Sequence, residues 1–184
     1  MSRRAFIIHG WGGYPEEGWF PWLKHELKQR QFSVEVPQLP KAATPNRDEW
    51  LAALKEIVGK PNRHTYLIGH SLGCYTILKY IESLQWFQRV GGVVLVAGFA
   101  SLNIPLLNNF YSAPLNWKKI RRRAGRIVAL HSPKDPFVPL AKGEELRDKL
   151  GAKLLVLEGY RHFSGREGAT KLPSALDAVL EISG

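Results

Sequence analysis

The sequence has very little cysteine, no long apolar run and a shortage of acidic residues. Cys74 is its only cysteine in 184 residues, so no intramolecular disulfide can form and a reducing compartment fits best. The apolar run behind Arg3 and Arg4 is too short for a signal peptide, and no later run reaches the ~20 apolar residues of a membrane span. We therefore expect a cytoplasmic protein with no membrane span. No Cys/His cluster has the spacing of a zinc site, so we also expect no metal.

The shortage of acids leaves a formal net charge of +10, with 26 Lys and Arg against 16 Asp and Glu. Part of the excess is local, in Lys118, Lys119, Arg121, Arg122, Arg123 and Arg126. Such a cluster can contact nucleic acid phosphates or an anionic membrane surface. No zinc finger, basic zipper or aromatic RNP pattern accompanies it, so we interpret it as a solvated helix face and expect no nucleic acid partner.

Strand-like and helix-like patterns alternate along the whole chain. Apolar or β-branched runs predict strands at 6–8, 32–36, 65–70, 93–96, 126–130 and 154–157. Amphipathic spacing predicts helices at 21–30, 46–58, directly after residue 71, at 140–150 and at 173–182. This order predicts one α/β domain over residues 1–184, with a parallel sheet and helices on both faces. The irregular segment around 98–117 is our candidate for a small lid-like insertion.

The third predicted strand ends in the pattern G-x-S-x-G, as Gly69-His70-Ser71-Leu72-Gly73. This pattern is typical of a nucleophile elbow, in which a serine sits on a strained strand-to-helix turn and its neighbours need almost no side chain. The turn would lift the Ser71 hydroxyl above the sheet edge. It would also aim the Leu72 amide, at a helix N-terminus, toward a developing negative charge.

Two later strands end in residues that could serve Ser71. Asp135 lies in a turn bracketed by prolines after the fifth strand, and His162 lies in the loop after the sixth. Chemistry in parallel sheets gathers at the carboxyl ends of strands, and the order Ser, Asp, His is that of α/β-hydrolases. His131 also ends a strand and stays open as an alternative base. We interpret His70, despite its position beside Ser71, as a structural residue.

The loop after the first strand, His9-Gly10-Trp11-Gly12-Gly13, resembles the HGGG-type element that completes an oxyanion hole. We assign the amides of Leu72 and Trp11 to that hole, with Gly12 as the alternative to Trp11. Six aromatic residues could line a compact acyl pocket, although ordinary core packing would equally explain them. They are Trp11, Tyr14, Trp19, Phe20, Phe110 and Tyr111.

Taken together, these motifs resemble the small serine hydrolases related to retinoblastoma-binding protein 9. The resemblance rests on residues 8–13, 19–27, 69–73, 117–120, 135–139 and 159–163, and it runs nearly end to end. It implies a reduced, three-layer α/β-hydrolase fold with a six-stranded, mainly parallel sheet in the order 2-1-3-4-5-6. It also implies a triad of Ser71, Asp135 and His162.

We therefore expect a serine hydrolase, most simply a carboxylesterase acting on small acyl esters through an acyl-enzyme and without a cofactor. A thioesterase, amidase or peptidase would use the same triad, and an interaction protein could keep the same scaffold. A retinoblastoma-type partner is not expected. The L-x-C-x-E motif that would bind such a partner would fall on residues 72–76 of this chain, where Thr76 replaces the acid.

Overall fold

The computed structural model describes residues 2–102, 105–107, 110–111 and 114–184, and within them six strands alternate with six α-helices. The strands are Arg3–Ile8 (β1), Phe32–Glu35 (β2), Thr65–His70 (β3), Gly92–Val96 (β4), Arg126–His131 (β5) and Lys153–Val156 (β6). The helices are Phe20–Gln29 (α1), Arg47–Val58 (α2), Leu72–Ser83 (α3), Trp117–Arg123 (α4), Leu140–Leu150 (α5) and Pro173–Ser183 (α6). The predicted elements are confirmed, with their ends shifted by a few residues.

All six described strands form one sheet, in the order β2-β1-β3-β4-β5-β6, and every neighbouring pair is parallel. The predicted fold class and strand order are therefore confirmed. In a parallel sheet all carboxyl ends lie along one edge and all amino ends along the other. We call these the carboxyl edge and the amino edge.

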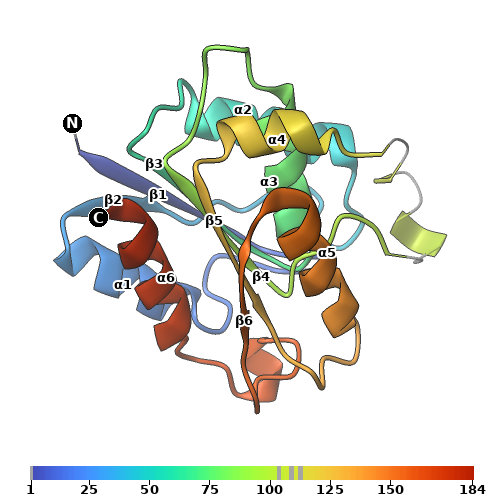
Figure 1. The fold of residues 1–184 in the computed structure, drawn as a ribbon. Helices are drawn as coiled ribbons and strands as arrows, with labels where there is room; N and C mark the ends of the chain where they lie inside the picture. The colour runs from blue at the N-terminus through green and yellow to red at the C-terminus, as the bar shows by residue number, and fades with distance from the viewer. Residues whose placement is uncertain (1, 103–104, 108–109, 112–113) are drawn as a thin grey trace.

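Helices cover both faces of the sheet and create two apolar cores (Figure 1). Buried residues of α2, α3, α4 and α5 pack on one face, and those of α1 and α6 pack on the other. Successive strand residues alternate between the two cores: Phe6 and Ile8 of β1 belong to the first, Ala5 and Ile7 to the second. The central strands β3 and β4 are covered on both faces and are buried throughout, whereas β2 and β6 at the two sides of the sheet have exposed residues.

The predicted lid at 98–117 falls partly on residues 103–104, 108–109 and 112–113, which lie outside the described part of the chain. Its described residues Phe99, Leu107, Phe110 and Leu115 are buried in the core on the α3 side of the sheet. The basic segment that follows forms α4, with Ile120 turned into the core and Lys118, Lys119, Arg121 and Arg122 exposed. No helix among the described residues is long and apolar enough to cross a bilayer.

Candidate active site

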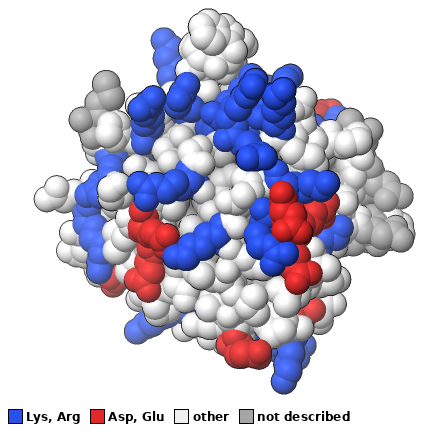
Figure 2. All heavy atoms as spheres, in the orientation of Figure 1, with Lys and Arg blue, Asp and Glu red and all other residues white. Residues whose placement is uncertain are grey.

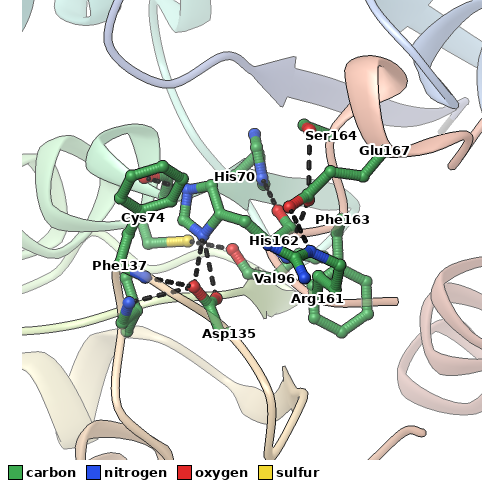
Figure 3. A network of polar contacts seen from close by, with 12 residues as sticks. His70, Cys74, Val96, Asp135, Phe137, Arg161, His162, Phe163, Ser164 and Glu167 are labelled. Carbon is green, nitrogen blue, oxygen red and sulfur yellow. Dashed lines mark hydrogen bonds and ion pairs between the residues drawn. The ribbon is translucent and has the colours of Figure 1, made fainter. Parts of the chain in front are cut away.

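Three strands deliver Ser71, Asp135 and His162 to the carboxyl edge of the sheet. Ser71 directly follows β3, Asp135 lies in the turn after β5, and His162 lies in the loop after β6. The His162 Nε2 atom lies 3.0 Å from Ser71 Oγ. Its Nδ1 atom lies 2.8 Å and 3.0 Å from the two carboxylate oxygens of Asp135 (Figure 3). The imidazole is thus in position to accept the Ser71 proton while its other nitrogen donates to a carboxylate.

Ser71 has the strained backbone that a nucleophile elbow requires, with φ 53° and ψ −120°. Glycines stand two positions before and after Ser71 because nothing larger fits there. A Cβ on Gly69 would lie 2.9 Å from the Cys74 backbone, and one on Gly73 would overlap the carbonyl oxygens at the end of β1. A Cβ on Gly10 would lie 3.0 Å from the Ser71 Cβ, so the loop after β1 passes directly beside the serine.

Asp135 is held as an acceptor by two backbone amides besides the histidine. Phe137 N and Val138 N donate to its Oδ1 at 2.8 Å and 3.0 Å, and its side chain is almost completely buried. Burial raises the pKa of Asp135, but the hydrogen bond from His162, its charge and the two amides outweigh burial and leave the pKa below its usual value. The carboxylate therefore stays ionised and oriented toward Nδ1 of His162.

The loop that carries His162 is strained on both sides of the histidine. Arg161 and Phe163 have φ values of 48° and 58°, a backbone region that residues other than glycine rarely adopt. Glu167 holds this loop: its Oε2 accepts from the His162 amide at 2.8 Å and from Ser164 Oγ at 3.1 Å. Its Oε1 accepts from Arg161 Nε at 3.0 Å. Burial raises the pKa of Glu167, but these hydrogen bonds together lower it, so the anchor is an ionised carboxylate.

His70 makes a contact that its sequence position did not reveal. Its Nε2–H donates to the His162 carbonyl oxygen at 2.7 Å, because a carbonyl can only accept (Figure 3). Burial, together with the neighbouring charge of His162, lowers the pKa of His70 to about 3, so the ring is neutral. His70 is a structural residue as predicted, and it acts on the backbone of His162.

The other two buried histidines form no hydrogen bond with Ser71. His131, the alternative base, is fully buried, and neither of its ring nitrogens has a hydrogen-bond partner among the described residues. Burial lowers its pKa to about 4. His9 donates from Nδ1 to the Gly10 carbonyl at 2.8 Å and accepts from the Leu39 amide at 2.9 Å, so it braces the glycine-rich loop. The geometry thus leaves His162 as the base that can reach Ser71.

A cleft of about 730 Å³ opens above Ser71 and His162. Of the six aromatics predicted to line a pocket, Trp11 and Tyr14 line it. The other four are not among its lining residues: Trp19, Phe20 and Phe110 are fully buried and Tyr111 packs against the core. Trp19 lies beneath the loop instead, where its Nε1–H donates to the Phe163 carbonyl at 3.0 Å. These four rings therefore pack in or against the apolar cores, which is the alternative that the sequence left open.

Other lining residues of the cleft were not predicted. The exposed Phe137 lies edge-on to the His162 ring at 5.0 Å, and Glu17, Arg166 and Glu167 add charge. Burial raises the pKa of Glu17, and the nearby charges of Arg166 and His162 only partly offset this. The cleft is therefore a mixed polar and aromatic surface. Phe137 follows Asp135 by two residues, and that proximity is the one sequence signal that could have identified it.

The amides that could face an oxyanion come from two places. The Leu72 amide is at the first position of α3, where a helix offers no intrahelical acceptor. In the loop after β1, the Gly12 amide donates to the Ala42 carbonyl at 2.8 Å, whereas no backbone acceptor within the described chain takes the Trp11 amide. The structure also finds no group of three or more described His, Cys, Asp or Glu residues that could hold a metal ion.

Comparison with known proteins adds independent evidence. A family model described as serine hydrolase matches residues 5–181. The hydrolase YdeN of Bacillus subtilis (strain 168) is 32% identical over 181 residues, covering 97% of this chain and 95% of the relative. The serine hydrolase RBBP9 of Rattus norvegicus is 28% identical over 170 residues and covers 89% of each chain.

Solved structures agree. The crystal structure of the B. subtilis ydeN gene product superposes with a TM-score of 0.94 at 31% identity and covers 98% of both chains. A carboxylesterase structure from Nitrososphaera has a TM-score of 0.76 at 15% identity, covering 99% of this chain and 91% of its own, and shares the fold. With the elbow, the strand order and the family match in agreement, the chain belongs to the serine hydrolase family.

Proposed function

We propose that this serine hydrolase is a carboxylesterase that cleaves small acyl esters, with Ser71 as nucleophile, His162 as base and Asp135 as orienting acid. The observation that carries the proposal is the continuous set of contacts from Ser71 Oγ through His162 to Asp135, at 3.0 Å and 2.8 Å. His162 takes the hydroxyl proton as Ser71 attacks the ester carbonyl, and then gives it to the departing alcohol. Water, activated by the same histidine, hydrolyses the acyl-enzyme.

The oxyanion donors in this proposal are the backbone amides of Leu72 and Trp11. The Leu72 amide follows the nucleophile directly, and Gly10 brings the loop after β1 against the serine. The bond from Gly12 to Ala42 favours Trp11 over Gly12 as the second donor. Each such donor typically stabilises the transition state by about 2.7 to 4 kcal/mol.

We expect the cleft to bind small or polar acyl groups in preference to long alkyl chains. Glu17, Arg166 and Glu167 lie along it, and a long alkyl chain in contact with them would strip water from charges without replacing their hydrogen bonds. The acyl-transfer machinery itself does not distinguish esters from thioesters or amides. We place the reaction in the cytoplasm, because the only cysteine is free and buried.

Steady-state kinetics on matched substrates test this proposal. We expect turnover of acetyl and butyryl esters to exceed that of long-chain esters, and esters to exceed the matched thioester and anilide. Ser71→Ala should abolish turnover, while Ser83→Ala, at the far end of α3, should retain it. Equal turnover by wild type and Ser71→Ala would refute the nucleophile, and faster thioester or anilide cleavage would refute the esterase assignment.

A further inference from the structure

Three segments of the chain meet at the amino edge of the sheet. Residues 59–64, 84–92 and 117–126 lead into β3, β4 and β5, which are parallel neighbours. Backbone hydrogen bonds join them: Gly91 N donates to the Thr65 carbonyl at 2.8 Å, and Val90 N donates to the Arg123 carbonyl at 2.9 Å. We call the surface that these three segments form the basic edge.

The basic edge carries almost the whole net charge of the protein. Its three segments contain no Asp or Glu, and their cations are Lys60, Arg63, Arg89, Lys118, Lys119, Arg121, Arg122, Arg123 and Arg126. The other 17 of the 26 Lys and Arg nearly balance the 16 Asp and Glu. Figure 2 shows Lys and Arg gathered over α4 and beside the loop from α3 into β4. The charge is thus a property of one surface.

Most of these cations have no structural role. Arg123 donates to the Glu82 carbonyl at 2.8 Å, and Arg126 donates to the Glu181 carbonyl at 2.9 Å, so these two hold the fold. The other seven are exposed, and among the described residues their side chains form no ion pair or hydrogen bond. Cations that the protein itself leaves uncompensated are available to an anionic partner.

An exposed aromatic pair lies on the same edge. Trp86 is 83% exposed and Phe87 is 61% exposed. They belong to the loop between α3 and β4, which projects at the top of Figure 1 beyond α4. Their rings pack edge-to-face on each other at 5.5 Å. Two large apolar side chains held in water at a loop tip mark an interaction site, and Trp in particular favours the boundary between water and lipid.

We propose that the basic edge binds the surface of an anionic lipid bilayer, with Trp86 and Phe87 inserted among the headgroups. Lysine and arginine can lay their apolar stems along such a surface while their charges meet lipid phosphates. A nucleic acid strand fits less well, because stacking platforms present open ring faces to successive bases. Here the two rings are neighbours in sequence at one loop and pack edge-to-face, so they offer no row of parallel ring faces along a strand.

This orientation places the catalytic cleft on the side away from the bilayer. The cleft lies at the carboxyl edge and the basic edge lies at the amino ends of the same strands. The bound protein would therefore be held at the membrane while its cleft stays open to water. Binding is independent of catalysis, so it can be measured whether or not the proposed esterase activity is found.

Vesicle co-sedimentation of the full chain tests the proposal. We expect retention on phosphatidylcholine vesicles that contain phosphatidylglycerol, none on phosphatidylcholine alone, and loss of retention as salt is raised. Arg121→Gln with Arg122→Gln should weaken binding by about fivefold for each cation removed. Trp86→Ser with Phe87→Ser should weaken it without altering the salt dependence. Lys134→Gln with Lys171→Gln, exposed outside the basic edge, should leave it unchanged.

Four results would overturn the proposal. These are equal retention on uncharged vesicles, an equal loss of binding in the Lys134 and Lys171 control, tighter binding to single-stranded RNA than to anionic vesicles, and a concentration-dependent dimer that the Trp86 and Phe87 changes abolish. The last would assign the aromatic pair to a second copy of the chain. Because all changed side chains are exposed, thermal unfolding of each variant should match wild type.

Discussion

The two edges of the one parallel sheet carry opposite kinds of polar surface. At the carboxyl edge, Asp135 and Glu167 each accept several hydrogen bonds and are held in fixed geometry. At the basic edge, seven Lys and Arg side chains are exposed to solvent and form no ion pair or hydrogen bond within the described chain. Precise chemistry needs side chains that cannot move, whereas attraction to a charged surface needs only proximity. The sheet separates these two requirements in space.

Most of the backbone strain lies at the carboxyl edge. Of the six described residues other than glycine with positive φ values, Ser71, Ala97, Arg161 and Phe163 follow strands at that edge, whereas Gln31 directly precedes β2 at the amino edge and Lys41 lies in the loop before α2. Such residues cost about 1 to 3 kcal/mol each, so their surroundings must hold them in place. We therefore expect substitutions at the carboxyl edge to have the largest effects on catalysis.

Asp135→Asn should cause the largest loss at the carboxyl edge. The amide would keep the shape but would no longer hold His162 in the Nδ1–H tautomer, so Nε2 could not accept the Ser71 proton. We expect kcat on a small ester to fall by about 10⁴-fold with the fold retained. Asp148→Asn, on an exposed part of α5, is the control. A fall in kcat of less than tenfold would contradict the proposed role of Asp135 in orienting His162.

Glu167→Gln tests whether a residue outside the proposed triad positions His162. The amide keeps the size of the side chain but weakens its bonds to the His162 amide and Arg161, so the strained loop should relax. We expect kcat to fall by about 10- to 100-fold with little change in KM, since small misplacements are costly.

The matched control for Glu167 is Glu181→Gln, whose side chain pairs with Lys153 on the surface. It should leave kcat unchanged. If Glu167→Gln changes only the thermal midpoint, Glu167 stabilises the fold without positioning the histidine.

Acid should destabilise the protein through its buried histidines at the carboxyl edge. Burial lowers the pKa of His70 to about 3 and that of His131 to about 4, from 6.5 in the unfolded chain. Between these values the unfolded chain binds more protons than the folded chain. The free energy of unfolding should therefore fall as pH drops below about 6.5, by about 1.4 kcal/mol per pH unit for each group.

Urea unfolding across this pH range measures the slope. His131→Leu removes a ring with no hydrogen-bond partner among the described residues, so it should reduce the slope by one group's share. His64→Gln, exposed at the basic edge, controls for the loss of an imidazole. An unchanged slope in His131→Leu would contradict the assignment of a neutral, buried His131.

The smallest effect should be that of membranes on catalysis. Because the cleft and the basic edge lie at opposite ends of the strands, saturating anionic vesicles should leave kcat and KM for a water-soluble ester unchanged. Kinetics with and without vesicles would show this. Strong activation by vesicles would instead mean that the cleft faces the bilayer.

Much of this arrangement was readable from the sequence. Strand ends are marked by apolar runs, so the placement of Ser71, Asp135 and His162 at one edge followed from the parallel topology. Gly69 and Gly73 indicated the nucleophile elbow, because only small residues fit at those two positions. In each case a local pattern and a fold rule were sufficient.

Other features depend on contacts between distant segments. His70 reaches the His162 carbonyl across 92 positions, and nothing near His70 signals that bond. Trp19 and Phe20 are close in sequence to the glycine-rich loop, but proximity does not tell which rings turn inward. The basic edge could be recognised only from the strand order, which places residues 84–92 beside α4. Periodicity is local, whereas these are properties of tertiary packing.

Labelling with a fluorophosphonate, followed by peptide mass mapping, tests the central claim most directly. The probe should form one covalent adduct per chain, on the hydroxyl of Ser71, and no adduct on Ser71→Ala. Asp135→Asn should label far more slowly than wild type, because its histidine cannot take the serine proton. Absence of labelling in wild type, or an adduct on another residue, would contradict the account.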